Sequence, residues 1–310
     1  MRIVFMGTPE FALPSLSLLL KSQHQIAGVV TQPDKPRGRG LKLSSSPVKK
    51  FAELNDLKVL TPDKLKSEEF IDSLRELEPD LIAVVAFRIL PEEIFLLPPK
   101  GTINLHASIL PKYRGAAPIN WVIINGERIT GATTFFIQKK VDTGNIILQR
   151  EVEITPEENS GELSLKLSRL GAELLLETIN LIDKGEVRTF PQDESGISLA
   201  PKITEEVCKI DWTKKALEIN NLIRGLSPYP GAFTYFRGKL LKVYKAGVET
   251  GSSTPAEPGK VVEVNQTKGI LVQTGQGSLY LLEVQLEGKK KLMAADFMRG
   301  ARVKVGEKLG

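Results

Sequence analysis

The sequence predicts an α/β protein that combines a doubly wound, mainly parallel, Rossmann-like sheet with a C-terminal small β-barrel of the OB-like type. Strand-like runs alternate with helical periods through the first 188 residues, as in βαβ units. The run at residues 81–87 is apolar without polar alternation, which is typical of a sheet covered on both faces. Short strand-like runs separated by turns then follow one another between residues 232 and 286, which is typical of a small barrel.

The N-terminal part begins with a strand at residues 2–6, a turn at Gly7-Thr8-Pro9 and a helix with leucines at helical spacing. Further strands are predicted at 26–31, 59–60, 81–87 and 102–105, and helices at 47–54, 67–77 and 116–124. A hairpin of residues 133–138 and 145–153 and a long amphipathic helix at 161–183 complete a first domain, 1–188.

Residues 189–207 contain two prolines and no sustained period, so we expect a linker there. The second domain, 208–310, begins with a helix at 212–224. Its strands are predicted at 232–236, 240–246, 260–264, 269–273 and 278–286.

Composition excludes several classes of protein. The longest apolar run, 81–87, is far shorter than the ~20 residues of a membrane helix, and polar residues follow the first strand too soon for a signal peptide. We therefore expect a cytoplasmic, monomeric protein with no membrane association. One cysteine, Cys208, and two histidines, His24 and His106, make an internal disulfide or a multi-histidine metal site unexpected.

The positive charge is concentrated in the C-terminal third. Residues 208–310 carry 17 Lys and Arg against 9 Asp and Glu, a net charge of +8, whereas residues 1–207 have a net charge of −3. Such asymmetry favours a polyanionic partner, and surface solvation explains it equally well at this stage.

The first turn excludes two nucleotide-binding classes. Gly7-Thr8-Pro9-Glu10-Phe11-Ala12 has one glycine where the dinucleotide fingerprint needs three, and the chain has no Walker sequence. Pro9 fits the first position of a helix instead.

Asn104 and His106 form the most specific polar pair in the sequence. They are two residues apart in a predicted strand, so they share one face near its carboxyl end, where doubly wound folds place ligands. Asp142 lies in a later turn, Val141-Asp142-Thr143-Gly144. An amide, an imidazole and a carboxylate suit direct acyl-type transfer without a covalent intermediate. The alternative is structural: a strand-end Asn and His bonded to backbone, and an Asx turn.

These residues stand in a longer pattern that resembles the folate-dependent formyltransferases, which use 10-formyltetrahydrofolate. The pattern runs from Asn104-x-His106 through Ser108-Ile-Leu-Pro111-Lys-Tyr-Arg-Gly115-Ala-Ala-Pro118 to Asp142-Thr-Gly144. The segments that resemble the tRNA-acting branch of the family are 5–11, 31–40, 46–49, 210–212 and 258–259.

The resemblance implies a role for each motif. Asn104, His106 and Asp142 would be catalytic, and Ser108, Ile109, Leu110 and Pro111 would line the folate site, with no metal required. The acceptor would be the α-amino group of methionine esterified to initiator tRNA, held in part by the second domain. One motif departs from the family: the loop beside the pterin reads Ala86-Phe87-Arg88-Ile89-Leu90-Pro91, without the usual glycine and one residue shorter, so Phe87 and Arg88 would replace its folate contacts.

A basic segment follows the second predicted strand. We name four of its cations, assigned to tRNA binding, the basic arm: Lys35, Arg37, Arg39 and Lys42. Glycines and the absence of an apolar period predict an irregular segment that orders on phosphates, as arginine-rich segments do on RNA. A solvated linker with incidental charge is the alternative.

Two other functions fit parts of the sequence. A related formyltransferase could act on a small amine such as a nucleotide sugar or glycinamide ribonucleotide, which the basic C-terminal third disfavours. A non-catalytic RNA-binding protein is disfavoured by the intact Asn104, His106 and Asp142.

Overall fold

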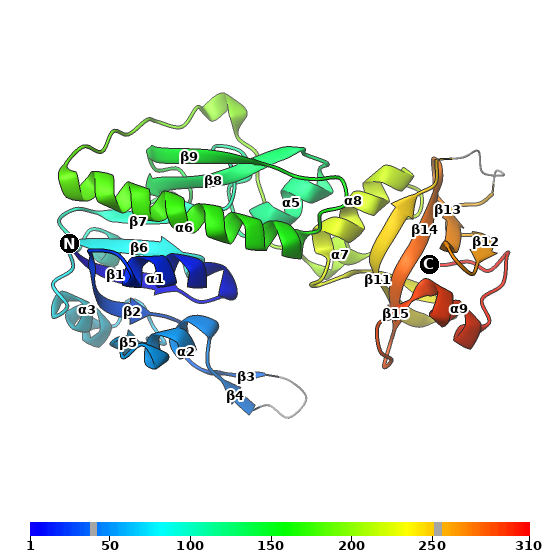
Figure 1. The fold of residues 1–310 in the computed structure, drawn as a ribbon, viewed down its shortest axis with the longest axis horizontal. Coiled ribbons are helices and arrows are strands. Elements are labelled where there is room, and N and C mark those ends of the chain that lie inside the picture. Colours follow the sequence, from blue (N-terminus) through cyan, green and yellow to red (C-terminus); the bar gives the residue numbers. More distant parts are fainter. Residues whose placement is uncertain (38–41, 251–255) are drawn as a thin grey trace. The chain divides into compact units, whose positions relative to one another are not determined.

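The computed structural model describes residues 1–37, 42–250 and 256–310, which form two compact units (Figure 1). Unit 1 consists of Met1–Gly115, Thr130–Glu153 and Ser164–Ala200. Unit 2 consists of Ala116–Ile129, Ile154–Leu163 and Pro201–Gly310. The units therefore interleave along the chain.

Unit 1 is built on a seven-stranded sheet in the order β5-β2-β1-β6-β7-β8-β9. Its strands are β1 (Arg2–Gly7), β2 (Gln25–Val30), β5 (Val59–Leu60), β6 (Leu81–Val85), β7 (Thr102–His106), β8 (Ile129–Phe136) and β9 (Ile146–Glu153). The first five pair in parallel, and β8 runs antiparallel to β7. The predicted doubly wound, mainly parallel sheet is confirmed.

Helices cover both faces of this sheet (Figure 1). Ile3 and Phe5 of β1 belong to a core shared with α1 (Leu13–Leu20), α2 (Pro47–Leu54) and α6 (Ser160–Lys184). Val4 and Met6 belong to the opposite core, shared with α3 (Glu68–Arg75) and α4 (Glu92–Phe95). Successive side chains of a strand point to opposite faces, so two covered faces explain why the strands are apolar throughout.

The basic segment differs from the irregular loop that its composition predicts. β3 (Lys35–Arg37) and β4 (Lys42–Ser44) pair as an antiparallel hairpin, which extends away from α2 in Figure 1. Two contacts fix its base: the Ser46 hydroxyl accepts from the amide of Lys49 as the cap of α2, and the Lys49 ammonium lies 2.9 Å from Asp34. This hydrogen bond from Lys49 holds the pKa of Asp34 below its usual range.

The segment after α6, residues 185–200, packs against the rest of unit 1. Phe190 forms a bridge to Ile146, and Leu199 one to Arg114, with a short 3-10 helix (Glu194–Gly196) between them. The expected linker therefore has defined contacts as far as Ala200.

Unit 2 contains an antiparallel sheet in the order β10-β11-β14-β13-β12. Its elements are α5 (Pro118–Ile124), α7 (Glu205–Cys208), α8 (Ala216–Leu226), β10 (Ala232–Phe236), β11 (Lys239–Val248), β12 (Val261–Asn265), β13 (Gly269–Gln273), β14 (Ser278–Leu286), β15 (Leu292–Met293) and α9 (Ala294–Ala301). The last residues of the chain bridge the two edges, since Leu309 pairs with Phe236 of β10 and Lys308 with Lys260 beside β12. The five predicted strands thus form one small, closed sheet around Trp212, Leu241 and Val272.

No helix among the described residues is long and apolar enough to span a membrane.

Candidate active site

Asn104 and His106 lie at the carboxyl end of β7, inside the sheet between β6 and β8. The two-residue spacing places them on one face of the strand. The Asn104 side chain is partly exposed, whereas the His106 side chain is 7% exposed. The amide can therefore reach a bound ligand, while the protein surrounds most of the imidazole.

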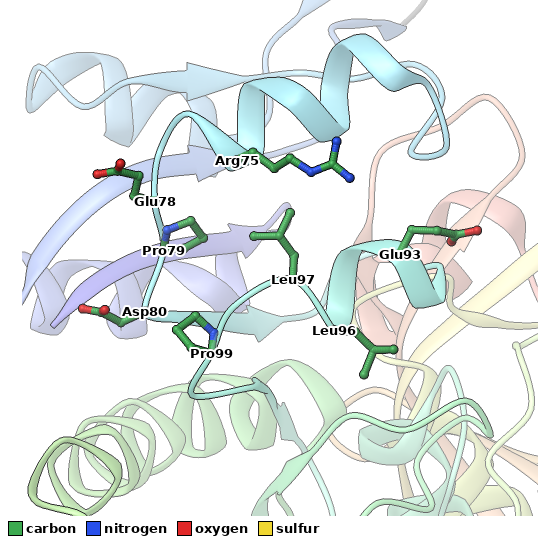
Figure 2. A pocket seen from close by; sticks show the side chains of 8 residues that line it. All are labelled: Arg75, Glu78, Pro79, Asp80, Glu93, Leu96, Leu97 and Pro99. Atoms are coloured by element: carbon green, nitrogen blue, oxygen red, sulfur yellow. The ribbon is translucent and has the colours of Figure 1, made fainter.

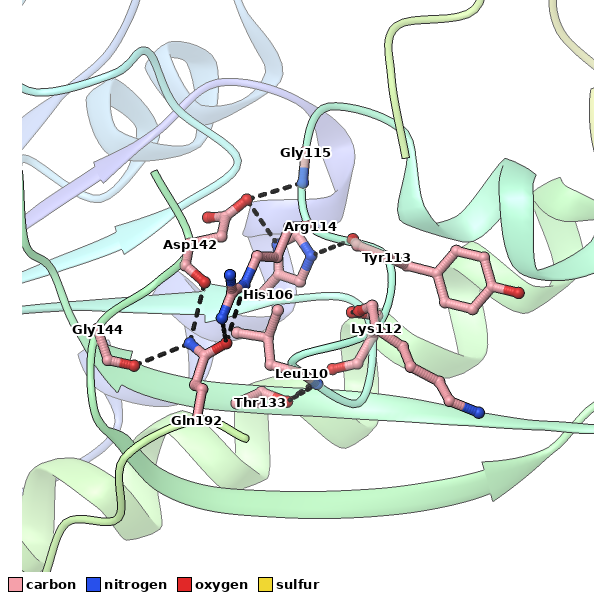
Figure 3. A network of polar contacts seen from close by, with 11 residues as sticks. His106, Leu110, Lys112, Tyr113, Arg114, Gly115, Thr133, Asp142, Gly144 and Gln192 are labelled. Carbon is pink, nitrogen blue, oxygen red and sulfur yellow. Dashed lines mark hydrogen bonds and ion pairs between the residues drawn. The ribbon is translucent and has the colours of Figure 1, made fainter. Parts of the chain in front are cut away.

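The groups that contact the two ring nitrogens of His106 determine which of them carries the hydrogen. Nε2 lies 2.8 Å from the Tyr113 carbonyl oxygen, which can only accept, so Nε2 carries a hydrogen and donates it (Figure 3). Nδ1 lies 3.9 Å from Oδ2 of Asp142. Nδ1 therefore has no hydrogen in the neutral ring, and it faces the Asp142 carboxylate.

Asp142 follows β8 in a turn that we call the Asp142 turn, residues 142–144. Its backbone adopts the left-handed conformation with φ of 54°, which Asp tolerates better than most residues. Oδ2 accepts a hydrogen bond of 2.9 Å from the amide of Gly115, and the side chain is 11% exposed. The predicted triad is therefore brought together by β7, the Asp142 turn and the loop after β7.

Two glycines allow the Asp142 turn and the loop after β7 to pack closely against neighbouring backbone. A Cβ on Gly144 would lie 1.7 Å from the Phe136 carbonyl oxygen, and one on Gly115 would lie 2.6 Å from that of Ala200. Both positions exclude a side chain because backbone passes directly beside them.

The predicted folate segment, 108–111, is tied into unit 1. The Ser108 hydroxyl is buried and donates to the Lys112 carbonyl over 2.7 Å, and Leu110 is 2% exposed. Thr133 binds the same loop, because its hydroxyl donates to the Ser108 carbonyl and accepts from the amide of Leu110. Ile109 and Pro111 are partly exposed. The loop thus has a fixed shape and offers apolar groups outward.

Arg88 joins the loop after β6 to the loop after β5. Its guanidinium donates to the carbonyls of Pro62 over 2.7 Å and Asp63 over 3.0 Å, and it lies 5.2 Å from the centre of the Phe87 ring. Burial lowers the pKa of Arg88. Beside it, Ile89 is 75% exposed.

The basic arm lies on the β3–β4 hairpin. Lys35 is exposed on β3, and Arg37 pairs with Lys42 in the ladder. Arg39 lies outside the described residues.

The structure also has an open depression of about 600 Å³ (Figure 2). Its lining comes from the segments before β6 and β7, with Arg75, Asp80, Glu93 and Leu97 among the residues. These segments meet the amino ends of the strands, the edge opposite Asn104 and His106. None of the predicted site residues within the described part of the chain lines it. Among the described residues, no cluster of three or more His, Cys, Asp or Glu could hold a metal ion.

Comparison with known proteins identifies the family. Residues 1–179 match the family model described as formyl transferase, and residues 202–302 match the model of the formyl transferase C-terminal domain. The chain belongs to the formyl transferase family.

Curated relatives of this formyltransferase match along its whole length. The methionyl-tRNA formyltransferases of Acetivibrio thermocellus and Alkaliphilus oremlandii are 45% and 47% identical to it, and the alignments cover 100% of each chain. Among solved structures, WlaRD, a sugar 3N-formyl transferase crystallised in the presence of dTDP and 5-N-formyl-THF, has a TM-score of 0.67 at 21% identity, over 94% of this chain and 99% of that chain. At this identity the structural likeness shows a shared fold alone.

Three contacts of this formyltransferase site could not be predicted from the sequence. They are the Tyr113 carbonyl on His106, the Gly115 amide on Asp142, and Gln192 beside the Asp142 turn. The first two are backbone groups and have no sequence signal of their own. Gln192 lies in a stretch without periodicity, so only the fold brings it to the site.

Proposed function

We propose that this chain transfers the formyl group of 10-formyltetrahydrofolate to the α-amino group of methionine on initiator tRNA. The full-length similarity to methionyl-tRNA formyltransferases supports this acceptor. The observation that carries the chemistry is His106, with Nε2 bound to a carbonyl and Nδ1 turned toward Asp142. That arrangement leaves one nitrogen to move a proton.

The bound folate supplies the formyl carbon and, on its own nitrogen, the leaving group. The side-chain amide of Asn104, and His106 through Nδ1 when that nitrogen carries a proton, donate to the oxygen that becomes negative when the amine attacks this carbon. Asp142 positions His106 and assists removal of the proton that the attacking amine loses. The bond from the formyl carbon to the folate nitrogen then breaks, and that nitrogen takes up a proton as tetrahydrofolate leaves. The amine attacks directly, since the Ser108 hydroxyl is buried and donates its hydrogen to the Lys112 carbonyl.

The residues at this edge fit a folate. A pterin has apolar faces and a polar edge, and such ligands bind among apolar side chains with a few convergent polar groups. Ile109, Pro111 and Ile89 offer the apolar groups, and Asn104 offers a polar one. Ser108 and Leu110 hold the loop in shape, while Phe87 and Arg88 set the position of the loop that carries Ile89.

The basic arm and the basic C-terminal residues 208–310 would bind the tRNA phosphates, with the catalytic part at 1–188 and the connection at 189–207. Phosphate contacts release counterions, so this binding weakens as salt rises. A tRNA substrate places the reaction in the cytoplasm.

An acceptor assay tests the proposal. Purified protein with 10-formyltetrahydrofolate is offered methionyl initiator tRNA, free methionine or an amino-sugar nucleotide. We expect formylation of the charged tRNA with the highest kcat/KM. Faster formylation of the sugar nucleotide would assign the chain to small amines, and binding of tRNA without transfer would make it an RNA-binding protein.

A further inference from the structure

Gln192 lies between the Asp142 turn and Arg114 (Figure 3). Its Nε2 donates to the carbonyl oxygens of Asp142 and Gly144, each over 2.9 Å. Its Oε1 accepts from Nε of Arg114 over 3.0 Å and from Nη2 over 2.6 Å. One side-chain amide thus uses both hydrogens and both lone pairs.

The orientation of this amide has one solution. Backbone carbonyls can only accept, and a guanidinium can only donate, so exchanging Oε1 and Nε2 of Gln192 would break all four hydrogen bonds. Arg114 is 7% exposed, and Gln192 itself is half-buried. The link is therefore specific and largely protected from water.

The hydrogen bonds of Gln192 and Arg114 connect to those of His106 and Asp142. Three consecutive residues, which we call the 113–115 segment, each hold one part of the site: the Tyr113 carbonyl binds His106, the Arg114 side chain binds Gln192, and the Gly115 amide binds the Asp142 carboxylate. Gln192 adds a second connection between this segment and Asp142, through the Asp142 carbonyl. The positions of His106 and Asp142 are thus set against the same short stretch of backbone.

The Asp142 turn needs such a connection. Asp142 has φ of 54°, a conformation that surrounding contacts must hold in place. The turn also ends at Gly144, whose carbonyl is the second partner of Gln192. A shift of the turn would move Oδ2 relative to Nδ1 of His106, which lies 3.9 Å away.

We propose that Gln192 is a positioning residue for formyl transfer: it clamps the Asp142 turn to Arg114 and so sets where the Asp142 carboxylate stands beside His106. The inference rests on the proposed function for its readout. It gives residues 189–207, which were expected to be a linker, a residue that positions the catalytic Asp142. Gln192 need not touch either substrate, so its effect falls on turnover rather than on substrate affinity.

Two substitutions separate clamping from simple attachment of the segment. Gln192→Glu keeps acceptors for Arg114 and loses both donors to the Asp142 turn, whereas Gln192→Met loses all four contacts. We expect both to lower kcat about 10- to 100-fold, since a displacement near 1 Å costs about 10²-fold, with both KM values within about threefold of wild type. The matched control is Asp193→Ala, which breaks only the bonds of Asp193 to Ser195 and should keep kcat within about twofold.

The background variant Asp142→Asn provides the deciding readout. If Gln192 acts through Asp142, adding Gln192→Glu to the Asp142→Asn variant lowers kcat by less than about a further threefold. The two effects then do not multiply, because one residue acts through the other. A Gln192→Glu enzyme with normal kcat, or effects that multiply in the double variant, would overturn the inference. Every variant is assayed with the best acceptor of the wild-type chain. Transfer only to another amine overturns the proposed function alone, and a wild-type chain that formylates no acceptor overturns both.

Discussion

Replacing His106 by alanine tests the chemistry assigned to the site. The substitution removes Nδ1, the nitrogen that can exchange a proton, so we expect kcat to fall by ~10²–10⁴-fold, the usual contribution of a general acid-base group. It also removes the hydrogen bond of 2.8 Å that Nε2 donates to the Tyr113 carbonyl, which should lower the free energy of unfolding by ~1–3 kcal/mol. A domain stable by ~5–15 kcal/mol stays folded after this loss.

The other histidine is a matched control. Polar residues surround His24 in the sequence, but in the structure its side chain is buried and Nε2 lies 2.9 Å from Oδ1 of Asn180. His24→Ala should therefore lower the free energy of unfolding by a similar ~1–3 kcal/mol and leave kcat unchanged. Turnover is followed as formyl-methionyl-tRNA formed, and unfolding in urea. A folded His106→Ala enzyme with near-normal kcat, or equal losses of kcat in both variants, would refute the reasoning.

Four further outcomes follow from named contacts. Asn104→Ala, read by the same assay, should lower kcat ~10²–10³-fold as a lost oxyanion donor, and a smaller loss of less than tenfold would remove that role. Arg88→Ala, which frees the carbonyls of Pro62 and Asp63, should raise the KM for folate about tenfold while the KM for tRNA stays constant; equal changes in both would contradict a local role. Alanine at all four positions of the basic arm should reduce the slope of log Kd for tRNA against log salt by roughly three to four, whereas neutralising four cations within residues 51–188 should not. Burial and a hydrogen bond to Glu263 raise the pKa of Tyr280 to about 12, above the unfolded value of ~10. The stability that the neutral phenol contributes is therefore complete below about pH 10 and is lost as the pH rises to about 12. In urea unfolding measured between these pH values, the free energy of unfolding should fall less steeply in Tyr280→Phe than in wild type.

Local periodicity accounts for most of the fold. Apolar runs at 81–87 and 102–105 and the short strands after residue 230 correspond to β6, β7 and β10–β14 within a few residues. Asn104 and His106 were predictable for the same reason, because a strand period fixes their common face. The sequence predicted a turn at Asp142, and the resemblance to the formyltransferases implied its catalytic role.

Contacts between distant residues account for the rest. Lys49 follows the basic arm closely in the sequence, yet its ammonium pairs with Asp34. Helix α5 reads as part of the first domain, but it packs on α8, where the side-chain amide of Asn120 donates to the Gly225 carbonyl over 2.7 Å. A cut at residue 207 would therefore uncover α5, which is why the tests above use the full chain. No sequence period encodes such pairs, nor the four bonds of Gln192.

The proposed proton transfer at His106 requires that the hydrogen of the neutral ring lies on Nε2, so that Nδ1 is free. The chain has only two histidines, so ¹⁵N-histidine labelling gives two ring systems, and the His24→Gln variant assigns them. We predict that the neutral ring of His106 carries its hydrogen on Nε2, which is bonded to the Tyr113 carbonyl, and has no hydrogen on Nδ1. A neutral ring with its hydrogen on Nδ1 and Nε2 free would contradict the assignment of Nδ1 as the nitrogen that moves the proton.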